Sequence, residues 1–470
     1  MSGQWNMPEY VPRHPPPLPS LWIILGVYVV IQALGAAITI ITWGARPMDS
    51  GDFLIRLLVL PVSLTCGLCG LFYATYARDG NLARLWNYLG EATTAERRKW
   101  AQERVAIVAC TTLTPEPELA ERMLGLEGPK PANTGKFLAL PQPSADATIT
   151  RLEDVLTTLL TPMAGTVSQT MMSGHLHVCL QSTTQADLAE LQQLWPRLGL
   201  TNNVHFSWVS LDENVSLTTP WWTADYRQPD ARLTLGCQLH IENETPAWSE
   251  MAVALLTTTP ERLAKRYSRP IKPLAYLFRP IAAEPDRASE ALATLLRAEQ
   301  APRDRLKQVW LSGLVKPLRH AVAAAVKDSE LDSPVHVLDE AVGDVGPVGA
   351  LLVQALAAQM VQHGQGVQLV AAPAPSQAPA LGLEWNMVGV ELAQIDEVRY
   401  EGMPSYNLPL CLGLTGFGNG LIWGADTLGV KSPAFFWTMV GVMVALPILL
   451  TAASWIRDQL LTDEFFEALE

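Results

Sequence analysis

The cysteine side chains are the groups in this chain with the most reactive chemistry. Cys110, Cys179, Cys237 and Cys411 lie outside the transmembrane-like apolar stretches. A cysteine becomes a nucleophile when its thiol pKa is lowered, for example at the N-terminus of a helix. Cys179 and Cys237 instead fall inside short apolar runs of strand length, and Cys411 precedes a glycine-rich run. We therefore expect these thiols to be buried apolar groups and assign no catalytic residue.

A histidine pair offers a second kind of chemistry. His175 and His177 alternate along a predicted strand and could ligate a metal ion, but no third ligand stands at a diagnostic spacing. The glycines Gly416, Gly418 and Gly420 lack the full dinucleotide-binding spacing and the lysine of a phosphate-binding loop. The sequence thus predicts neither a metal site nor a cofactor site.

Two glycine-rich runs carry the most specific local patterns. Gly343–Ala350 reads Gly-Asp-Val-Gly-Pro-Val-Gly-Ala and leads into an apolar helix predicted over 345–363. Thr415–Gly420 reads Thr-Gly-Phe-Gly-Asn-Gly and follows an apolar segment. Glycines at a helix start permit tight turns and close backbone packing. The candidate loop residues are Gly343, Asp344, Gly346, Gly416, Phe417, Gly418 and Gly420.

Together with the apolar run Val105–Cys110, these glycine runs resemble the thiolase and β-ketoacyl-synthase superfamily over about residues 104–424. In that family a glycine loop closes the site and a glycine-flanked helix start carries a catalytic histidine. At the position of that histidine this chain has Asp344, and no cysteine has the setting of the family's nucleophile. The resemblance therefore implies a thiolase-like fold whose chemistry has been lost.

Three apolar stretches, 21–43, 57–77 and 433–456, are each about 20 residues long and almost free of charge. At ~1.5 Å per residue, a helix of this length crosses a hydrocarbon core of ~30 Å. We predict three transmembrane helices. The chain then divides into a Pro-rich leader 1–20, a helical hairpin 21–77, a helical stalk 78–104, an α/β domain 105–430, a third span 433–456 and an acidic tail 457–470.

Charge predicts the location of these parts. The net charge of -13 excludes nucleic acid as a partner, because binding to phosphates requires clustered cations. Arginines gather directly after the second span, whereas the loop before it and the tail hold few cations. By the positive-inside rule the N-terminus and the central domain are cytoplasmic, and three crossings place the tail in the periplasm. We expect a multi-pass protein of a bacterial inner membrane.

The central region alternates strand-like and helical segments. Runs such as 204–210 and 251–257 have strand character, and segments such as 287–298 and 304–314 have helical character. This alternation predicts an α/β domain with mostly parallel, layered sheets covered by helices on both faces. A duplication of two halves is an open alternative.

Three further segments, Leu176–Ser182, Ala189–Trp195 and Ser249–Leu256, resemble membrane-anchored proteins of Gram-negative type VI secretion clusters. Those similar to the type VI lipase adaptor family carry a synthase-like domain without catalysis, so the resemblance implies a non-enzymatic role. Trp221 and Trp222 form an aromatic pair that is either an interaction surface or part of the core.

The leading hypothesis is a non-enzymatic inner-membrane protein-interaction module, a type VI secretion accessory that serves as an effector adaptor or as an immunity partner. Its expected partners are the membrane and a secreted effector or secretion component; self-association stays open. Two alternatives are a membrane-tethered acyltransferase of the thiolase or ketosynthase kind, using a displaced cysteine, and an envelope-assembly factor.

Overall fold

The computed structural model describes residues 5–17, 20–44, 47–48, 50–141, 149–171, 174–200, 204–213, 217–218, 230–241, 244–265, 271–375, 382–400, 413–416, 418, 420, 422, 425 and 432–468. They form two compact units. The first, which we call the body, comprises Met1–Met7 and Arg97–Ile395. The second, which we call the helical unit, comprises Pro8–Glu96 and Asp396–Glu470.

The body is built on one sheet with the strand order β3-β2-β4-β5-β1-β6-β11-β10-β8-β9, and β7 pairs with β11. Its strands are β1 (Arg104–Leu113), β2 (Leu176–Ser182), β3 (Val204–Ser210), β4 (Ala231–Gln238), β5 (Met251–Thr258), β6 (Ala275–Phe278), β7 (Ile281–Ala283), β8 (Leu306–Leu311), β9 (Val335–Val337), β10 (Val367–Ala372) and β11 (Leu383–Gly389).

The sheet is mixed, so the expectation of mostly parallel strands is not confirmed. Only the pairs β2–β3, β2–β4, β8–β9 and β8–β10 are parallel, and the remaining pairs are antiparallel. Local periodicity identifies a strand but carries no information about the direction of its neighbour. A second difference concerns residues 304–314, which the sequence predicted to be a helix. Within this range Leu306–Leu311 forms strand β8, in which alternate residues face opposite sides of the sheet.

The sheet repeats one strand arrangement twice. In the first half, β1 to β5, the order is β3-β2-β4-β5-β1; in the second half, β6 to β11, the order β9-β8-β10-β11-β6 places corresponding strands in corresponding positions. The parallel and antiparallel relations also correspond, and β1 pairs with β6 in antiparallel fashion where the halves meet. The topology therefore supports the duplication that the sequence left open.

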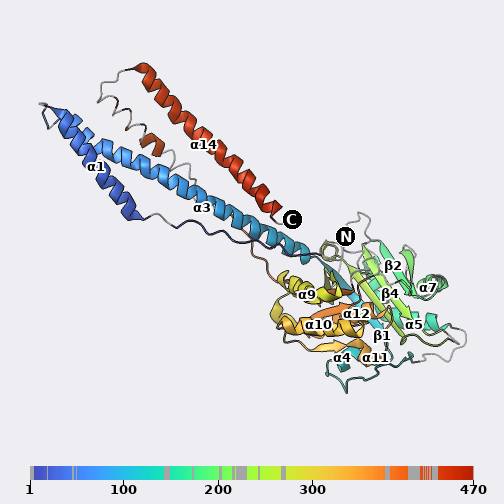
Figure 1. Cartoon of the computed structure of the whole chain (residues 1–470). Coiled ribbons are helices and arrows are strands. Elements are labelled where there is room, and N and C mark those ends of the chain that lie inside the picture. The colour runs from blue at the N-terminus through green and yellow to red at the C-terminus, as the bar shows by residue number, and fades with distance from the viewer. Residues whose placement is uncertain are drawn as a thin grey trace. The chain divides into compact units, whose positions relative to one another are not determined.

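Helices cover both faces of the sheet. On the outer face, α5 (Arg151–Leu160), α6 (Ala164–Met171) and α7 (Ala186–Arg197) cover the first half, whereas α9 (Ala288–Arg297) and α10 (Lys316–Asp328) cover the second half (Figure 1). On the inner face lie α4 (Leu119–Met123), α11 (Leu338–Val342) and α12 (Gly349–Gln362). The short elements α8 (Pro260–Lys265), η2 (Thr161–Met163), η4 (Pro285–Arg287) and η5 (Arg303–Arg305) complete the body.

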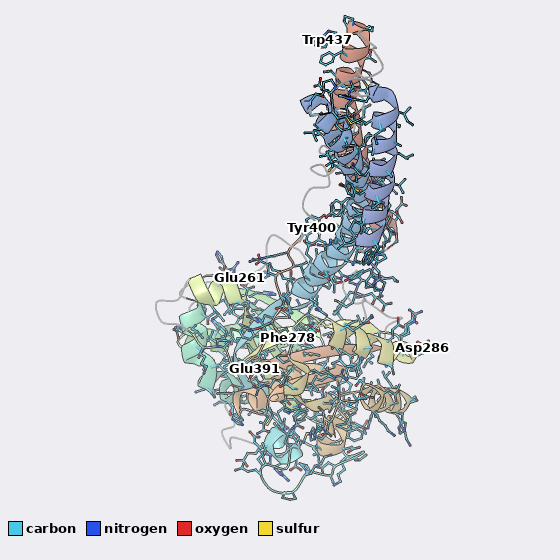
Figure 2. The ribbon with its side chains drawn as sticks, turned by 90° about the vertical axis from the view of Figure 1, so that its left-hand side faces the viewer. Glu261, Phe278, Asp286, Glu391, Tyr400 and Trp437 are labelled. Atoms are coloured by element: carbon cyan, nitrogen blue, oxygen red, sulfur yellow. The ribbon has the colours of Figure 1, made fainter. Side chains whose placement is uncertain are left out.

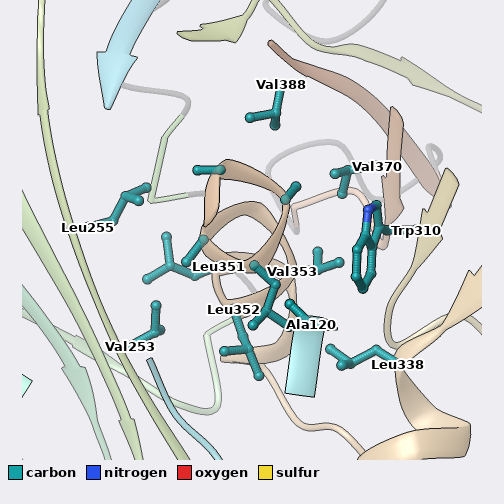
Figure 3. Close-up of a cluster of buried hydrophobic side chains, with 14 of the residues drawn as sticks. Ala120, Val253, Leu255, Trp310, Leu338, Leu351, Leu352, Val353, Val370 and Val388 are labelled. Carbon is teal, nitrogen blue, oxygen red and sulfur yellow. The ribbon is translucent and has the colours of Figure 1, made fainter. Parts of the chain in front are cut away.

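Helix α12 is the centre of the body. Nearly all of its residues are buried, because strands of both halves pack around it. Figure 3 shows Leu351 on the side of Val253 and Leu255, and Val353 on the side of Trp310 and Val370. The all-round apolar character that the sequence shows over 345–363 is the expected pattern of a fully buried core helix.

The helical unit contains the apolar helices. Its elements are α1 (Leu21–Trp43), α2 (Gly51–Leu54), the π-helical turn η1 (Ile55–Val59), most of α3 (Leu60–Ala101) and α14 (Pro433–Glu467). Two segments, Leu21–Trp43 and Gly51–Gly70, are long and apolar enough to cross a membrane, and most of their side chains are exposed. The third predicted span forms part of α14, along which Trp437, Ile448 and Leu449 are exposed.

Two ends of the helical unit are distinguished by their contacts. Figure 2 shows Trp437 and Tyr400 toward opposite ends of it. At one end Trp43 contacts Phe53 edge-to-face at 5.0 Å. At the other end the Phe465 ring packs on the Trp86 ring at 5.1 Å. There Arg13 pairs with Glu464 at 2.8 Å and lies over the Trp86 ring.

Candidate functional site

The start of α12 is held by glycines that leave no room for a side chain. Gly343 has φ 82° and forms an isolated β-bridge with Phe137, and a Cβ at this position would overlap the Lys136 carbonyl. A Cβ at Gly346 would overlap the Gln238 amide. Only glycine is free of a Cβ at such close approaches, so the run Gly343–Ala350 is explained by packing.

The Gln238 side chain links this start to the first half of the sheet. Its Nε2 donates to the Ser249 carbonyl at 2.6 Å, and its Oε1 accepts from the Val348 N–H at 3.5 Å. The Asp344 carbonyl in turn accepts from the Ser249 N–H at 2.8 Å. The Asp344 side chain itself is exposed. It therefore stands outside the interior position that a catalytic histidine would need.

A small cavity lies beside the first turn of α12. Its volume is about 40 Å³. Gln354 and Glu384 contribute the carbonyl and carboxyl groups of its wall, and Thr218 a hydroxyl; most of the other lining is apolar or proline, including Ala350, Leu351 and Pro373. A water molecule requires ~10–15 Å³ of such space, whereas small-molecule sites span ~300–1,000 Å³. The cavity therefore holds a few water molecules and excludes a drug-sized substrate.

Glu384 is the titratable group of this cavity. It is the second residue of β11 and shares a face of that strand with Asn386, on the side of α12. The residue as a whole is partly exposed, but protein atoms surround its carboxyl group. This burial raises the pKa of Glu384 to about 7. The loss of hydration explains this direction, since burial penalises the charged form of an acid.

One buried polar atom of a residue in the cavity lining, Gln354 Oε1, lacks a hydrogen-bond partner within the described part of the chain. Gln354 is 6% exposed. The first amide groups of a helix also have no acceptor inside the helix, and Ala350 and Leu351, which line the cavity, belong to that turn. Elsewhere among the described residues, both amide atoms of Asn386 and Ser312 Oγ are buried without a partner. Buried polar groups normally find partners, so the cavity is suited to bind water or a small polar group.

The three cysteines of the body, Cys110, Cys179 and Cys237, lie on strands, as the sequence predicted for Cys179 and Cys237. Cys110 lies on β1 beside α12, with its Sγ 3.8 Å from the Ala355 carbonyl, and burial raises its pKa to about 12. Cys237 on β4 is fully enclosed, and burial, together with the charge of Asp187, raises its pKa to about 12. At neutral pH these two thiols are protonated and therefore unreactive.

The histidine pair of the sequence does not form a ligand set. His177 stacks on His205 of the neighbouring strand at 5.1 Å, and its Nδ1 accepts a hydrogen bond from Arg232 Nε at 3.2 Å. Burial, with the positive charge of Arg232 and the neighbouring His205, lowers the pKa of His177 to about 4. In the parts of the chain that the structure describes, no group of three His, Cys, Asp or Glu side chains could hold a metal ion.

The second glycine run belongs to the helical unit and not to the body. Gly416, Gly418 and Gly420 have helical backbone, whereas the sequence suggested a loop. A Cβ at Gly416 would stand 3.0 Å from the Ser63 carbonyl, and one at Gly420 2.9 Å from Leu64. Phe417, Cys411, Trp221 and Trp222 lie outside the described residues.

Sequence reasoning missed Glu384, Gln354 and Asn386. A signal existed for two of them: the run Leu-Glu-Trp-Asn-Met-Val places Glu384 and Asn386 two residues apart in an apolar strand. Two polar residues on one face of a strand otherwise buried on both faces indicate a polar interior. That Glu384 and Gln354 line the same cavity could be seen only from the fold.

No family model matches the chain, and no curated protein matches it. Solved structures resemble it weakly. A type II polyketide ketosynthase bound to its acyl-carrier protein is 9% identical, with 61% of this chain and 99% of that chain covered and a TM-score of 0.44. Human mitochondrial 3-ketoacyl-CoA thiolase is 9% identical, covering 62% and 99%, with a TM-score of 0.38. A variant of OleA from Xanthomonas campestris is 12% identical, covering 61% and 98%, with a TM-score of 0.36.

These structures share the thiolase and ketosynthase fold that the sequence resembles. Each of these TM-scores is below 0.5, and each identity is below 25%.

Proposed function

We propose that this protein is a non-enzymatic, membrane-anchored interaction module of the bacterial inner membrane, acting as a type VI secretion accessory that recruits an effector or serves as an immunity partner. The observation that carries the proposal is the chemistry of the body's interior. Cys110 and Cys237 lie on strands with thiol pKa values near 12, and the cavity at α12 has a volume of about 40 Å³. Such an interior supports a scaffold and not turnover of a substrate.

The N-terminal segment supports a membrane hairpin. Trp5 is 8% exposed in the body's core, and its Nε1 donates to the Pro280 carbonyl at 2.8 Å. The N-terminus and the body therefore lie on one side of any membrane. The chain between Met7 and Arg97 must cross an even number of times, which agrees with two spans, Leu21–Trp43 and Gly51–Gly70.

We propose that the C-terminal tail lies on that same side, in place of the periplasmic side expected from the sequence. Arg13 precedes the first span, and it pairs with Glu464. Trp86 follows the second span, and it packs on Phe465. The periplasmic tail expected from the sequence followed from counting three crossings after a cytoplasmic N-terminus.

With the tail on the body's side, the chain between the body and the tail crosses the membrane an even number of times. The second glycine motif lies in the apolar run 408–430, which holds a single charged residue, Asp426. Within it, Gly416 approaches the Ser63 carbonyl and the Gly67 backbone of α3. Small residues let helices pack closely in a membrane, so we assign this motif to helix packing.

The topology is tested with fusions to the full chain. We expect green fluorescent protein to fluoresce at the N-terminus and at the C-terminus, because it matures in the cytoplasm. An active alkaline phosphatase fused to the C-terminus would contradict a cytoplasmic tail. For the packing role, Gly416→Leu should lower the detergent-state Tm, whereas Gly441→Leu should leave it unchanged, since nothing lies within 4 Å of a Cβ there.

The function is tested by co-purification. The full chain, tagged and extracted in mild detergent, should retain a product of a neighbouring gene, and so should the variant with Cys110, Cys179 and Cys237 all changed to Ala. A chain that retains none of these products contradicts the proposal. Loss of capture in the alanine variant, with its folding intact, would favour the acyltransferase alternative.

One observation favours an enzyme as the second candidate. Glu384 has a pKa of about 7, which is the range of an effective general base at neutral pH. A membrane-tethered acyltransferase would need this carboxyl for its activity. If Glu384→Gln leaves the protein's cellular phenotype unchanged, the carboxyl has no catalytic role.

A further inference from the structure

A second, larger pocket lies on the body, away from α12. Its volume is about 460 Å³, within the ~300–1,000 Å³ of small-molecule sites. The N-terminal segment, the end of α3, β7 and the start of α9 form its walls. Its polar lining consists of Asn6, Arg97, Arg287, Glu290 and Thr294.

The N-terminal wall of this pocket is a fixed part of the body. Trp5 and Met7 are 8% and 3% exposed. The Trp5 ring meets Trp100 edge-to-face at 5.6 Å, and its Nε1 is held by the Pro280 carbonyl. The pocket therefore has an aromatic wall that does not depend on a ligand for its position.

Positive charge is concentrated beside that wall. Arg97 donates through Nε to the Asn6 carbonyl at 3.1 Å and lies over the Trp100 ring at 4.2 Å. Arg279 lies over the same ring at 3.9 Å and pairs with Glu103. Burial, and then the charge of Arg279, lower the pKa of Arg97. No carboxylate among the described residues forms an ion pair with Arg97, so its positive charge is not neutralised by a neighbour.

Arg287 adds a second guanidinium to the pocket. It is exposed, and no side-chain hydrogen bond or ion pair connects it to any described residue. The pocket's one carboxylate is Glu290, so its lining keeps an excess of one positive charge. A guanidinium presents a fork of donors that matches carboxylate and phosphate oxygens.

We propose that this pocket binds a small organic anion whose carboxylate or phosphate group is held by Arg97 and Arg287, while its apolar part lies against Trp5 and the alanines of β7 and α9. The inference goes beyond the proposed function and does not depend on it. Carboxylate and phosphate share the recognition chemistry, so the experiment includes both.

The test is calorimetric titration of the full chain in nanodiscs of zwitterionic lipid, corrected with empty nanodiscs. The probes are 2-naphthoate, 1-naphthyl phosphate and the neutral 2-naphthalenemethanol. We expect at least one anion to bind at least tenfold more tightly than the neutral compound. Binding of neither anion above the neutral compound would overturn the proposal.

Two variants locate the site. Arg287→Gln should weaken anion binding by tenfold or more without loss of folding, because Arg287 is exposed. Arg97→Gln should do the same, but it also removes the contact with Trp100, so Arg287→Gln is the decisive variant. Arg303→Gln, on an exposed arginine that does not line the pocket, is the matched control. Anion affinity that is equal in Arg287→Gln and in the unchanged protein would place the binding elsewhere.

Discussion

The two halves of the sheet each place a glutamate at the start of the corresponding strand; both carboxyl groups are buried, but they differ in their hydrogen-bond donors. Glu250 directly precedes β5 and is 0% exposed. It accepts from the Leu140 and His240 backbone N–H groups, both at 2.7 Å, and pairs with Arg151. Glu384 at the start of β11 has burial without such donors, and its pKa is raised to about 7.

The contrast separates a structural carboxylate from one that is available for binding or proton transfer. The outer face of the first half supplies a loop and a helix that donate to Glu250. The inner face of the second half surrounds Glu384 with α12, prolines and Gln354, whose Oε1 has no partner among the described residues. A buried carboxyl without donors is costly to the fold unless it is protonated or a ligand compensates it.

The largest expected effect comes from removing the satisfied carboxylate. Glu250→Ala leaves two backbone N–H groups and Arg151 without their acceptor, and we expect a loss of about 3–5 kcal/mol in the free energy of unfolding. Thermal or chemical unfolding of the detergent-solubilised chain measures it. The control is Glu340→Ala, which breaks an exposed contact with Lys130 and should cost less than about 1 kcal/mol. Equal effects of the two changes would remove the distinction between the halves.

Replacing the unsatisfied carboxyl of Glu384 should increase the free energy of unfolding, which is the opposite of the effect expected at Glu250. The folded pKa of Glu384 is raised, so its protonated form is favoured by folding, and stability falls as pH rises from the unfolded pKa near ~4.3 to about 7. Glu384→Gln removes this loss. We expect the variant to be more stable at pH 8 by up to about 3 kcal/mol and nearly unchanged at pH 4. A variant that is destabilised at pH 8 would show that the carboxylate is compensated.

A smaller effect tests the packing at the start of α12. Gly346→Ala forces a Cβ into the Gln238 amide, which must release the Ser249 carbonyl, and we expect a cost of about 1–3 kcal/mol. Gly165→Ala is the matched control in α6, because nothing lies within 4 Å of a Cβ there. Compared with the unchanged protein, Gly346→Ala should lower the unfolding midpoint and Gly165→Ala should raise it. A neutral Gly346→Ala would mean that this turn is not tightly packed.

The sequence predicted those features that local pattern controls. The segment Val204–Ser210 is a strand with the expected bounds, β5 follows Met251–Thr257 closely, and α12 falls inside 345–363. The two N-terminal spans are apolar helices, the second beginning at Gly51 and not at Leu57. These predictions succeed because periodicity and apolar length depend on neighbouring residues alone.

Features that depend on distant residues could not be predicted in this way. Strand direction, the pairing of β1 with β6 and the repeat of strand order need the whole sheet. The glycines at Gly343 and Gly416 gave the same signal in sequence, yet one opens a buried helix of the body and the other contacts α3 in the helical unit. A glycine in the sequence indicates that another group packs closely against the backbone there, but it does not identify that group.

The proposed non-enzymatic body requires that Cys110 and Cys237 do not act as nucleophiles. Native alkylation of the full chain with iodoacetamide at pH 8, followed by peptide mass spectrometry, tests this requirement. Cys110 and Cys237 should remain unmodified for hours in the folded protein and react fully after denaturation, because burial holds their pKa values near 12. Rapid modification of either residue in the folded protein would contradict the account and restore a nucleophile to this fold.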